Sequence, residues 1–129
     1  MRSNKLTIQI NKSPAEIFKF YINPKNTHLW VESIIDEQTN EWPIKTGTVY
    51  SNQNKAGIWS EYRVTEVINN ELFELISGDG NYHVRYSHKI INQKTSELEY
   101  YEWVDRVEID GPFTQDILEK LKTILEDER

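Results

Sequence analysis

Residues 6 to 30 read LTIQINKSPAEIFKFYINPKNTHLW. At the start of this stretch apolar and polar side chains alternate, with Leu6, Ile8 and Ile10 on one side. A period of two residues is typical of a strand that buries one face. We therefore expect a strand up to Ile10, then a helix, and then a second short helical segment that ends at Trp30.

A helix start follows this strand directly. Ser13 suits the N-cap, because its hydroxyl can accept from the backbone N–H of Glu16 while the Glu16 carboxylate reaches back to the N–H of Ser13. Pro14 suits the first helical position, where no N–H is needed. Pro24 disfavours helical geometry at the residue before it, so the helix is expected to end near Ile22. The expected apolar face is Ile17, Phe18, Tyr21 and Ile22.

The composition limits the class of protein. The chain has 129 residues, which suits one domain over residues 1–129. It holds 21 acidic and 15 basic side chains and no cysteine. This excludes a disulfide framework and a thiolate metal site, and the negative charge disfavours nucleic-acid binding. No apolar run has the length of a signal peptide or a membrane span, so we expect a cytoplasmic protein.

Strand-like segments fill the chain after Trp30, and a helix follows them. Turn signals at residues 54–57, 69–70, 78–81 and 92–96 separate the segments. The expected strands cover residues 34–38, 47–50, 57–68, 71–77, 82–91 and 97–107. The last helix is expected from Pro112 to Asp127, with an apolar stripe of Phe113, Ile117, Leu118, Leu121, Ile124 and Leu125.

The last two strands form a hairpin whose register assigns side chains to faces. Pairing Ile91 with Glu97 places charged and complementary side chains on the outer face. The same register sets Tyr86 opposite Glu102 and His88 opposite Tyr100 on the inner face. These four groups can recognise a polar ligand, transfer protons, or hydrogen-bond one another.

The sequence resembles the START-like superfamily, also called SRPBCC. The motifs that carry the resemblance are residues 10–18 (INKSPAEIF), residues 23–26 (NPKN) and Trp30, with weaker likenesses at residues 47–50 (GTVY) and 62–67 (YRVTEV). The superfamily includes birch-pollen-allergen-like proteins, polyketide cyclase/dehydrase-like proteins and activators of a heat-shock chaperone ATPase. The resemblance extends over almost the whole chain, from Lys5 to Leu125.

This resemblance implies an α+β helix-grip fold. Six or seven antiparallel strands curve around the last helix, two short helices follow the first strand, and a cavity lies between them. The last helix is short for the superfamily, which is expected to leave the cavity small or open. Its lining also looks more polar than that of a plain lipid carrier.

The function implied by the resemblance is binding of a small, largely apolar molecule in a carrier, sensor or storage role. One alternative is an enzyme of the polyketide cyclase/dehydrase type that acts on a ketone, with His88 or Glu102 as general base. Another is a protein-interaction module similar to the chaperone ATPase activators, with a homodimer or a chaperone as partner. The sequence leaves open whether the chain is an enzyme.

The expected ligand-binding residues are Trp30, Tyr50, Tyr62, Tyr86, His88, Tyr100, Glu102, Phe113 and Ile117. The three histidines have no metal-ligand spacing, so no metal site is expected, and no cofactor is expected either. The pattern of residues 57–68 does not fix which face of that strand lines the cavity.

Overall fold

Seven strands and three helices make up residues 1–127, the part of the chain that this computed structural model describes. In chain order the elements are β1 (Ser3–Ile10), α1 (Pro14–Ile22), α2 (Thr27–Trp30), β2 (Ile34–Thr39), β3 (Val49–Asn54), β4 (Trp59–Ile68), β5 (Leu72–Ser77), β6 (Tyr82–Asn92), β7 (Thr95–Val104) and α3 (Gln115–Glu126). The strands form one sheet in the order β1-β7-β6-β5-β4-β3-β2. Every neighbouring pair is antiparallel, as the sequence predicted.

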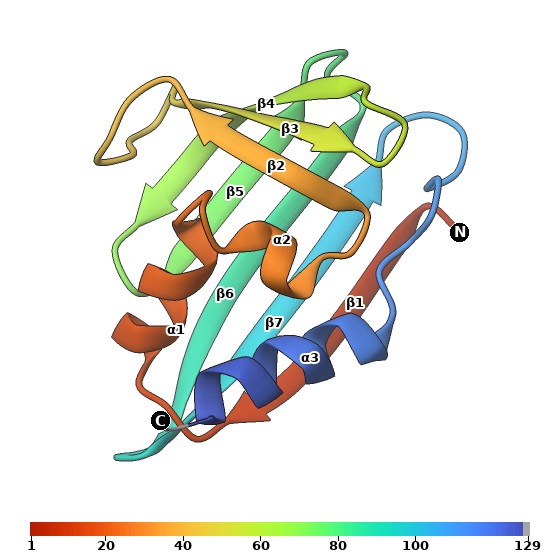
Figure 1. Ribbon diagram of the computed structural model, residues 1–129. Coiled ribbons are helices and arrows are strands. Elements are labelled where there is room, and N and C mark those ends of the chain that lie inside the picture. The colour runs from red at the N-terminus through yellow and green to blue at the C-terminus, as the bar shows by residue number, and fades with distance from the viewer. Residues whose placement is uncertain (128–129) are drawn as a thin grey trace.

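The sheet curves around the helices (Figure 1). α3 packs against β1 and meets α2, while α2 packs against β2 and α1 contacts β6. In Figure 1 the two short helices bridge the space between α3 and the end of the sheet formed by β2, β3 and β4. This arrangement is the helix-grip fold that the sequence predicted, with seven strands.

The predictions for the first thirty residues are confirmed. The backbone N–H of Glu16 donates to Ser13 Oγ at 3.2 Å, and the N–H of Ser13 donates to Glu16 Oε1 at 3.4 Å. These two bonds satisfy backbone N–H groups at the start of α1 that have no partner within the helix. The four residues of the expected apolar face are buried, α1 ends at Ile22, and α2 ends at Trp30.

The predicted register of the last hairpin is wrong by two residues. Tyr86 pairs with Tyr100, whereas the predicted register sets it opposite Glu102. The two strands meet in a tighter turn than expected, with a register irregularity between Ile90 and Asn92. Because the error is an even number of residues, the side chains of residues 82–88 and 98–104 stay on their predicted faces. Ile90, which was also expected on the inner face, is largely exposed beside the irregularity.

Two β-bulges decide which side chains of β2 and β4 face inward. A bulge inserts one extra residue and reverses the alternation beyond it. In β4 the register shifts after Val64, so Tyr62 and Val64 face inward before the shift and Val67 does so after it. In β2 the register shifts after Ile34, which brings Ile34 and Glu37 to the same side. The structure thus fixes the inner face of β4, which the sequence pattern left open.

The last helix is shorter than predicted. α3 begins at Gln115 rather than Pro112, because Thr114 has an extended backbone and serves as the N-cap. Leu118 and Leu121 are fully buried, and the rest of the predicted stripe packs partly buried against the core. No helix within residues 1–127 is long and apolar enough to cross a membrane.

Candidate functional site

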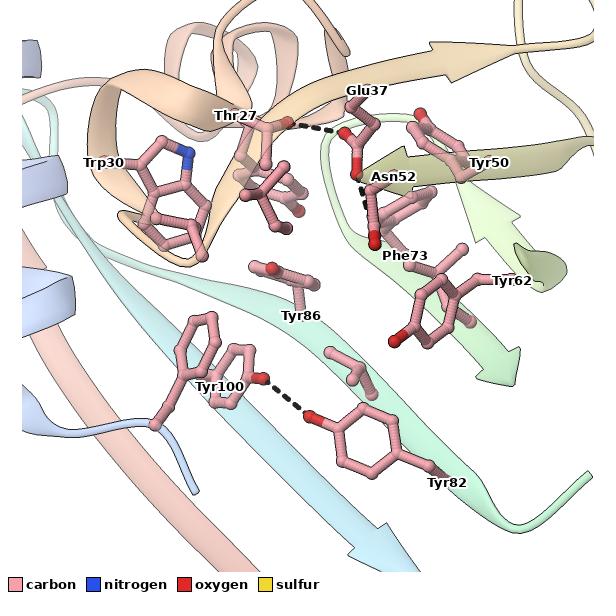
Figure 2. Close-up of a pocket in the computed structure, with 16 residues that line it drawn as sticks. Thr27, Trp30, Glu37, Tyr50, Asn52, Tyr62, Phe73, Tyr82, Tyr86 and Tyr100 are labelled. Atoms are coloured by element: carbon pink, nitrogen blue, oxygen red, sulfur yellow. Dashed lines mark hydrogen bonds between the residues drawn. The ribbon is translucent and has the colours of Figure 1, made fainter. Parts of the chain in front are cut away.

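A cavity of about 110 Å³ lies between the curved sheet and the two short helices. α1, α2, strands β2 to β7 and the segment before α3 all contribute to its walls. Nine of the 16 lining residues are aromatic: Tyr21, Trp30, Tyr50, Tyr62, Phe73, Tyr82, Tyr86, Tyr100 and Phe113. In Figure 2 the labelled rings of Trp30, Tyr62, Tyr82, Tyr86 and Tyr100 lie around the central space. The space suits a ligand on the order of a single small ring rather than a long lipid chain.

Glu37 of β2 is the acidic side chain of this lining. Thr27 Oγ1 donates to Glu37 Oε1 at 2.5 Å, and Asn52 Nδ2 lies 3.5 Å from Oε2 (Figure 2). Burial raises the pKa of Glu37 to about 7, the charge of Asp36 adds to this rise, and the two hydrogen bonds oppose it. Near neutral pH the side chain is therefore present both as a carboxylic acid and as a carboxylate.

Three further polar groups of the lining have no hydrogen-bond partner among the described residues. They are the hydroxyls of Tyr62 and Tyr86 and the indole nitrogen Nε1 of Trp30, which is fully buried. By contrast, the Tyr50 hydroxyl donates to the backbone oxygen of Ile22 at 2.6 Å. An indole N–H can only donate, and buried donors are normally paired. A ligand with an acceptor oxygen would offer a partner to the two tyrosine hydroxyls.

The cavity adjoins a wider surface hollow of about 720 Å³. The residues that line both spaces are Val31, Ile34, Asn52, Tyr62, Tyr82 and Phe113. Four carboxylates line the hollow: Glu61, Asp79, Glu108 and Asp110. Glu108 is paired with the amino group of Met1. Within residues 1–127, no lysine, arginine or histidine lines the cavity or the hollow, so this entrance attracts cations and repels anions.

Six of the nine residues expected to bind a ligand lie together around the cavity. They are Trp30, Tyr50, Tyr62, Tyr86, Tyr100 and Phe113. The other three, His88, Glu102 and Ile117, face the interior but do not line the cavity.

Glu102 is held in a structural role. It is fully buried, and Oε2 accepts from Asn4 Nδ2 and from the backbone N–H of Phe113, both at 2.8 Å. Oε1 accepts from the hydroxyl of Tyr82 at 2.7 Å. With three donors in place, this carboxylate ties β1 and β6 to the segment before α3.

His88 lies behind the wall of the cavity rather than in it. Its Nε2 is 2.6 Å from the hydroxyl of Tyr21, and the two rings stack at 5.5 Å. Burial lowers the pKa of His88 to about 4, so the imidazole is neutral at neutral pH. Tyr21 and Tyr86 in turn stack at 4.5 Å, which separates His88 from the cavity.

Sequence reasoning missed Glu37 and Tyr82. Tyr82 shares the inward face of β6 with Tyr86, so strict alternation along that strand would have found it. Glu37 lies beyond the bulge in β2, and alternation from Ile34 would have turned it outward. No signal in the sequence marks that bulge.

The comparisons with known proteins show the fold alone. No family model and no curated protein matches the chain by sequence. Among solved structures, XoxI from Bacillus cereus is 18% identical with a TM-score of 0.76, and the match covers 98% of this chain and 97% of that one. The Aha1 dimer from Colwellia psychrerythraea is 14% identical with a TM-score of 0.73, over 98% and 97% of the two chains.

A third solved structure has the same fold with a lower TM-score. Norcoclaurine synthase from Thalictrum flavum is 13% identical with a TM-score of 0.68, over 98% of this chain and 87% of that one. Each of these three matches covers 98% of this chain. This supports the helix-grip architecture and leaves the chemistry of the cavity to be argued from its own residues.

Proposed function

We propose that residues 1–129 form one START-like (SRPBCC) domain that binds a small, largely apolar molecule inside the cavity, in a carrier, sensor or storage role. The observation that carries the proposal is an aromatic cavity whose lining includes the hydroxyls of Tyr62 and Tyr86, which have no hydrogen-bond partner among the described residues. Aromatic walls favour burial of apolar surface. The likeness to norcoclaurine synthase and Aha1 supports the fold-level part of the proposal.

The polar groups of the lining give the ligand its orientation. The hydroxyls of Tyr62 and Tyr86 can donate to an acceptor oxygen of the ligand. A few such groups in an apolar pocket fix orientation and supply specificity. A ligand that lacked an acceptor would bury these hydroxyls without a partner, at a cost of about 1–3 kcal/mol each.

The enzyme alternative finds less support in this geometry. A general base must come within hydrogen-bond reach of the proton that it removes. Glu102 already accepts three hydrogen bonds, and His88 bonds to Tyr21 behind the cavity wall. In this arrangement neither residue can act as the general base that was expected from the sequence.

The interaction alternative rests on the Aha1 neighbour, which is described as a dimer. β2 is an edge strand of the sheet, and its outward Ile35 is half exposed. Such an edge can pair with a second strand. Sedimentation equilibrium distinguishes a dimer from a monomer directly, and the binding proposal holds in either state.

Occupation of the cavity can be tested with two matched variants on β6. Val84→Phe places a large ring in the cavity lining, whereas Ile90→Phe places one at an exposed position of the same strand. We expect small cyclic ketones or phenols to shift the Trp30 indole NMR signal of the parent protein and of Ile90→Phe. Val84→Phe should lose this response. If Val84→Phe responded as the parent does, the ligand would bind elsewhere and the proposal would fail.

A further inference from the structure

We infer that the ligand of this cavity is a small organic ammonium ion, held by the aromatic rings and by the carboxylate of Glu37. The inference rests on the proposed function, since it names the chemical class of the molecule that the cavity binds. Three features of the described residues support it: the aromatic walls, a carboxyl group without an ion-pair partner, and the charge of the entrance.

The aromatic walls suit a cation. The face of an aromatic ring carries partial negative charge, and an organic cation within about 6 Å of a ring centre is attracted to it. Tyr62 and Tyr82 meet edge to face at 6.4 Å, and Tyr86 meets Tyr100 in the same way at 5.2 Å. Rings that cross at steep angles form a box rather than a flat stack. Boxes of this kind bind ammonium groups in other proteins.

Glu37 provides the countercharge. No described residue forms an ion pair with it, because the nearby groups are the neutral side chains of Thr27 and Asn52. Buried carboxylates are normally paired, as Glu74 is with Arg85 at 2.7 Å. A bound cation would supply the missing partner of Glu37.

The alternative charged ligands fit less well. An anion would meet the carboxylates of the entrance and would find no basic side chain within residues 1–127 in the lining. A hard metal ion takes six or more oxygen ligands, whereas nine of the 16 residues here are aromatic. An ammonium ion needs one countercharge and apolar contact, and the cavity offers both.

The ammonium class predicts coupling between binding and the ionisation of Glu37. The groups that face Glu37 are Thr27 of α2, Tyr50 and Asn52 of β3, Tyr62 of β4, Tyr86 of β6 and its own neighbour Asp36. The pKa of each of these three tyrosines is raised by burial, so they stay neutral. A bound cation favours the ionised carboxylate, so binding near pH 7 should release a proton from Glu37.

The experiment compares choline with dimethylbutanol, its neutral isostere in which carbon replaces nitrogen. Each is titrated into the full chain while the Trp30 indole signal is followed by NMR at pH 8. We expect choline to bind about tenfold more tightly than dimethylbutanol or better. Glu37→Gln keeps the shape and removes the charge, and should abolish most of this preference. Glu32→Gln, at an exposed glutamate paired with Lys120, should leave it unchanged.

The outcomes separate the two proposals. Equal or tighter binding of dimethylbutanol would overturn the ammonium inference and leave the proposed function standing. No response to either probe at ~10 mM would count against the proposed function itself. Calorimetry of the parent protein in two buffers with different heats of ionisation adds a readout without a variant. Choline should release about half a proton at pH 7 and dimethylbutanol none, and equal release by both would also contradict the inference.

Discussion

Glu37 and Glu102 both lie on the inner face of the sheet, and they differ in the hydrogen-bond donors around their carboxyl groups. Glu102 receives three hydrogen bonds from Asn4, Tyr82 and the backbone of Phe113. Glu37 receives a short bond from Thr27 and a long one from Asn52. The carboxylate that is already satisfied stabilises the fold, whereas the one that is poorly satisfied is available to a ligand.

The pH dependence of stability should reveal Glu37 and His88 as opposing groups. Burial raises the pKa of Glu37 to about 7 and lowers that of His88 to about 4. The native state therefore binds an extra proton at Glu37 between pH ~4.5 and ~7, so stability falls as the pH rises. At His88 the unfolded state binds the extra proton between pH ~4 and ~6.5, so stability rises.

These two contributions should nearly cancel in the parent protein. Glu37→Gln removes the contribution of Glu37, which falls as the pH rises, and leaves that of His88. The free energy of unfolding of this variant should then rise by about 2 kcal/mol between pH 4.5 and 7. Urea denaturation across this range measures the effect. The double variant Glu37→Gln/His88→Gln is the control and should be flat again. A flat profile in Glu37→Gln alone would show that these pKa shifts are absent.

Glu102→Gln should destabilise the protein, although it is the same isosteric change. An amide has one acceptor oxygen, so one of the donors around it faces an N–H₂ group instead. We expect a loss of about 2–3 kcal/mol in the free energy of unfolding at pH 8. Glu99→Gln, on the outward face of the same strand near Lys5, should change it by under about 0.5 kcal/mol. Equal effects of the two changes would contradict the structural role of Glu102.

At the scale of elements, the sequence predicted the strands and helices themselves better than the directions in which their side chains point. All seven strands and three helices of residues 1–127 were expected, because alternation, caps and turn residues are local signals. The positions of Tyr86 and Tyr100 on the cavity wall followed from alternation, even with a wrong register. Glu37 could not be placed, because a bulge depends on strand pairing rather than on local sequence.

The capping box of α1 offers an element-scale prediction. Ser13→Ala removes the acceptor for the N–H of Glu16 and should cost about 1 kcal/mol of folding free energy. Ser13→Thr retains the hydroxyl and should cost less than half as much. Chemical denaturation measures both variants. A Ser13→Ala protein as stable as the parent would show that the bond contributes nothing net in solution.

At the scale of the whole molecule, the short last helix and the form of the cavity belong together. α3 begins only at Gln115, and Phe113 in the segment before it lines both the cavity and the outer hollow. The short last helix predicted from the sequence was the reason to expect a small or open cavity. The cavity volume depends on residues far apart in the chain, and so does the acidic entrance, which β4, the turn after β5 and the loop after β7 form together. No local pattern reports them.

Ligand binding should therefore appear as stability of the whole fold. A ligand that binds only the native state at a hundred times its dissociation constant adds about 2.7 kcal/mol to the free energy of unfolding. For a domain of this size that corresponds to a rise in Tm of roughly 10 °C. Choline at saturating concentration should give this rise at pH 8 and much less at pH 5.5, where Glu37 is protonated. Val84→Phe should show no rise at either pH, because the added ring occupies the cavity. A rise of equal size in Val84→Phe would place the site outside the cavity, and a rise independent of pH would remove Glu37 from it.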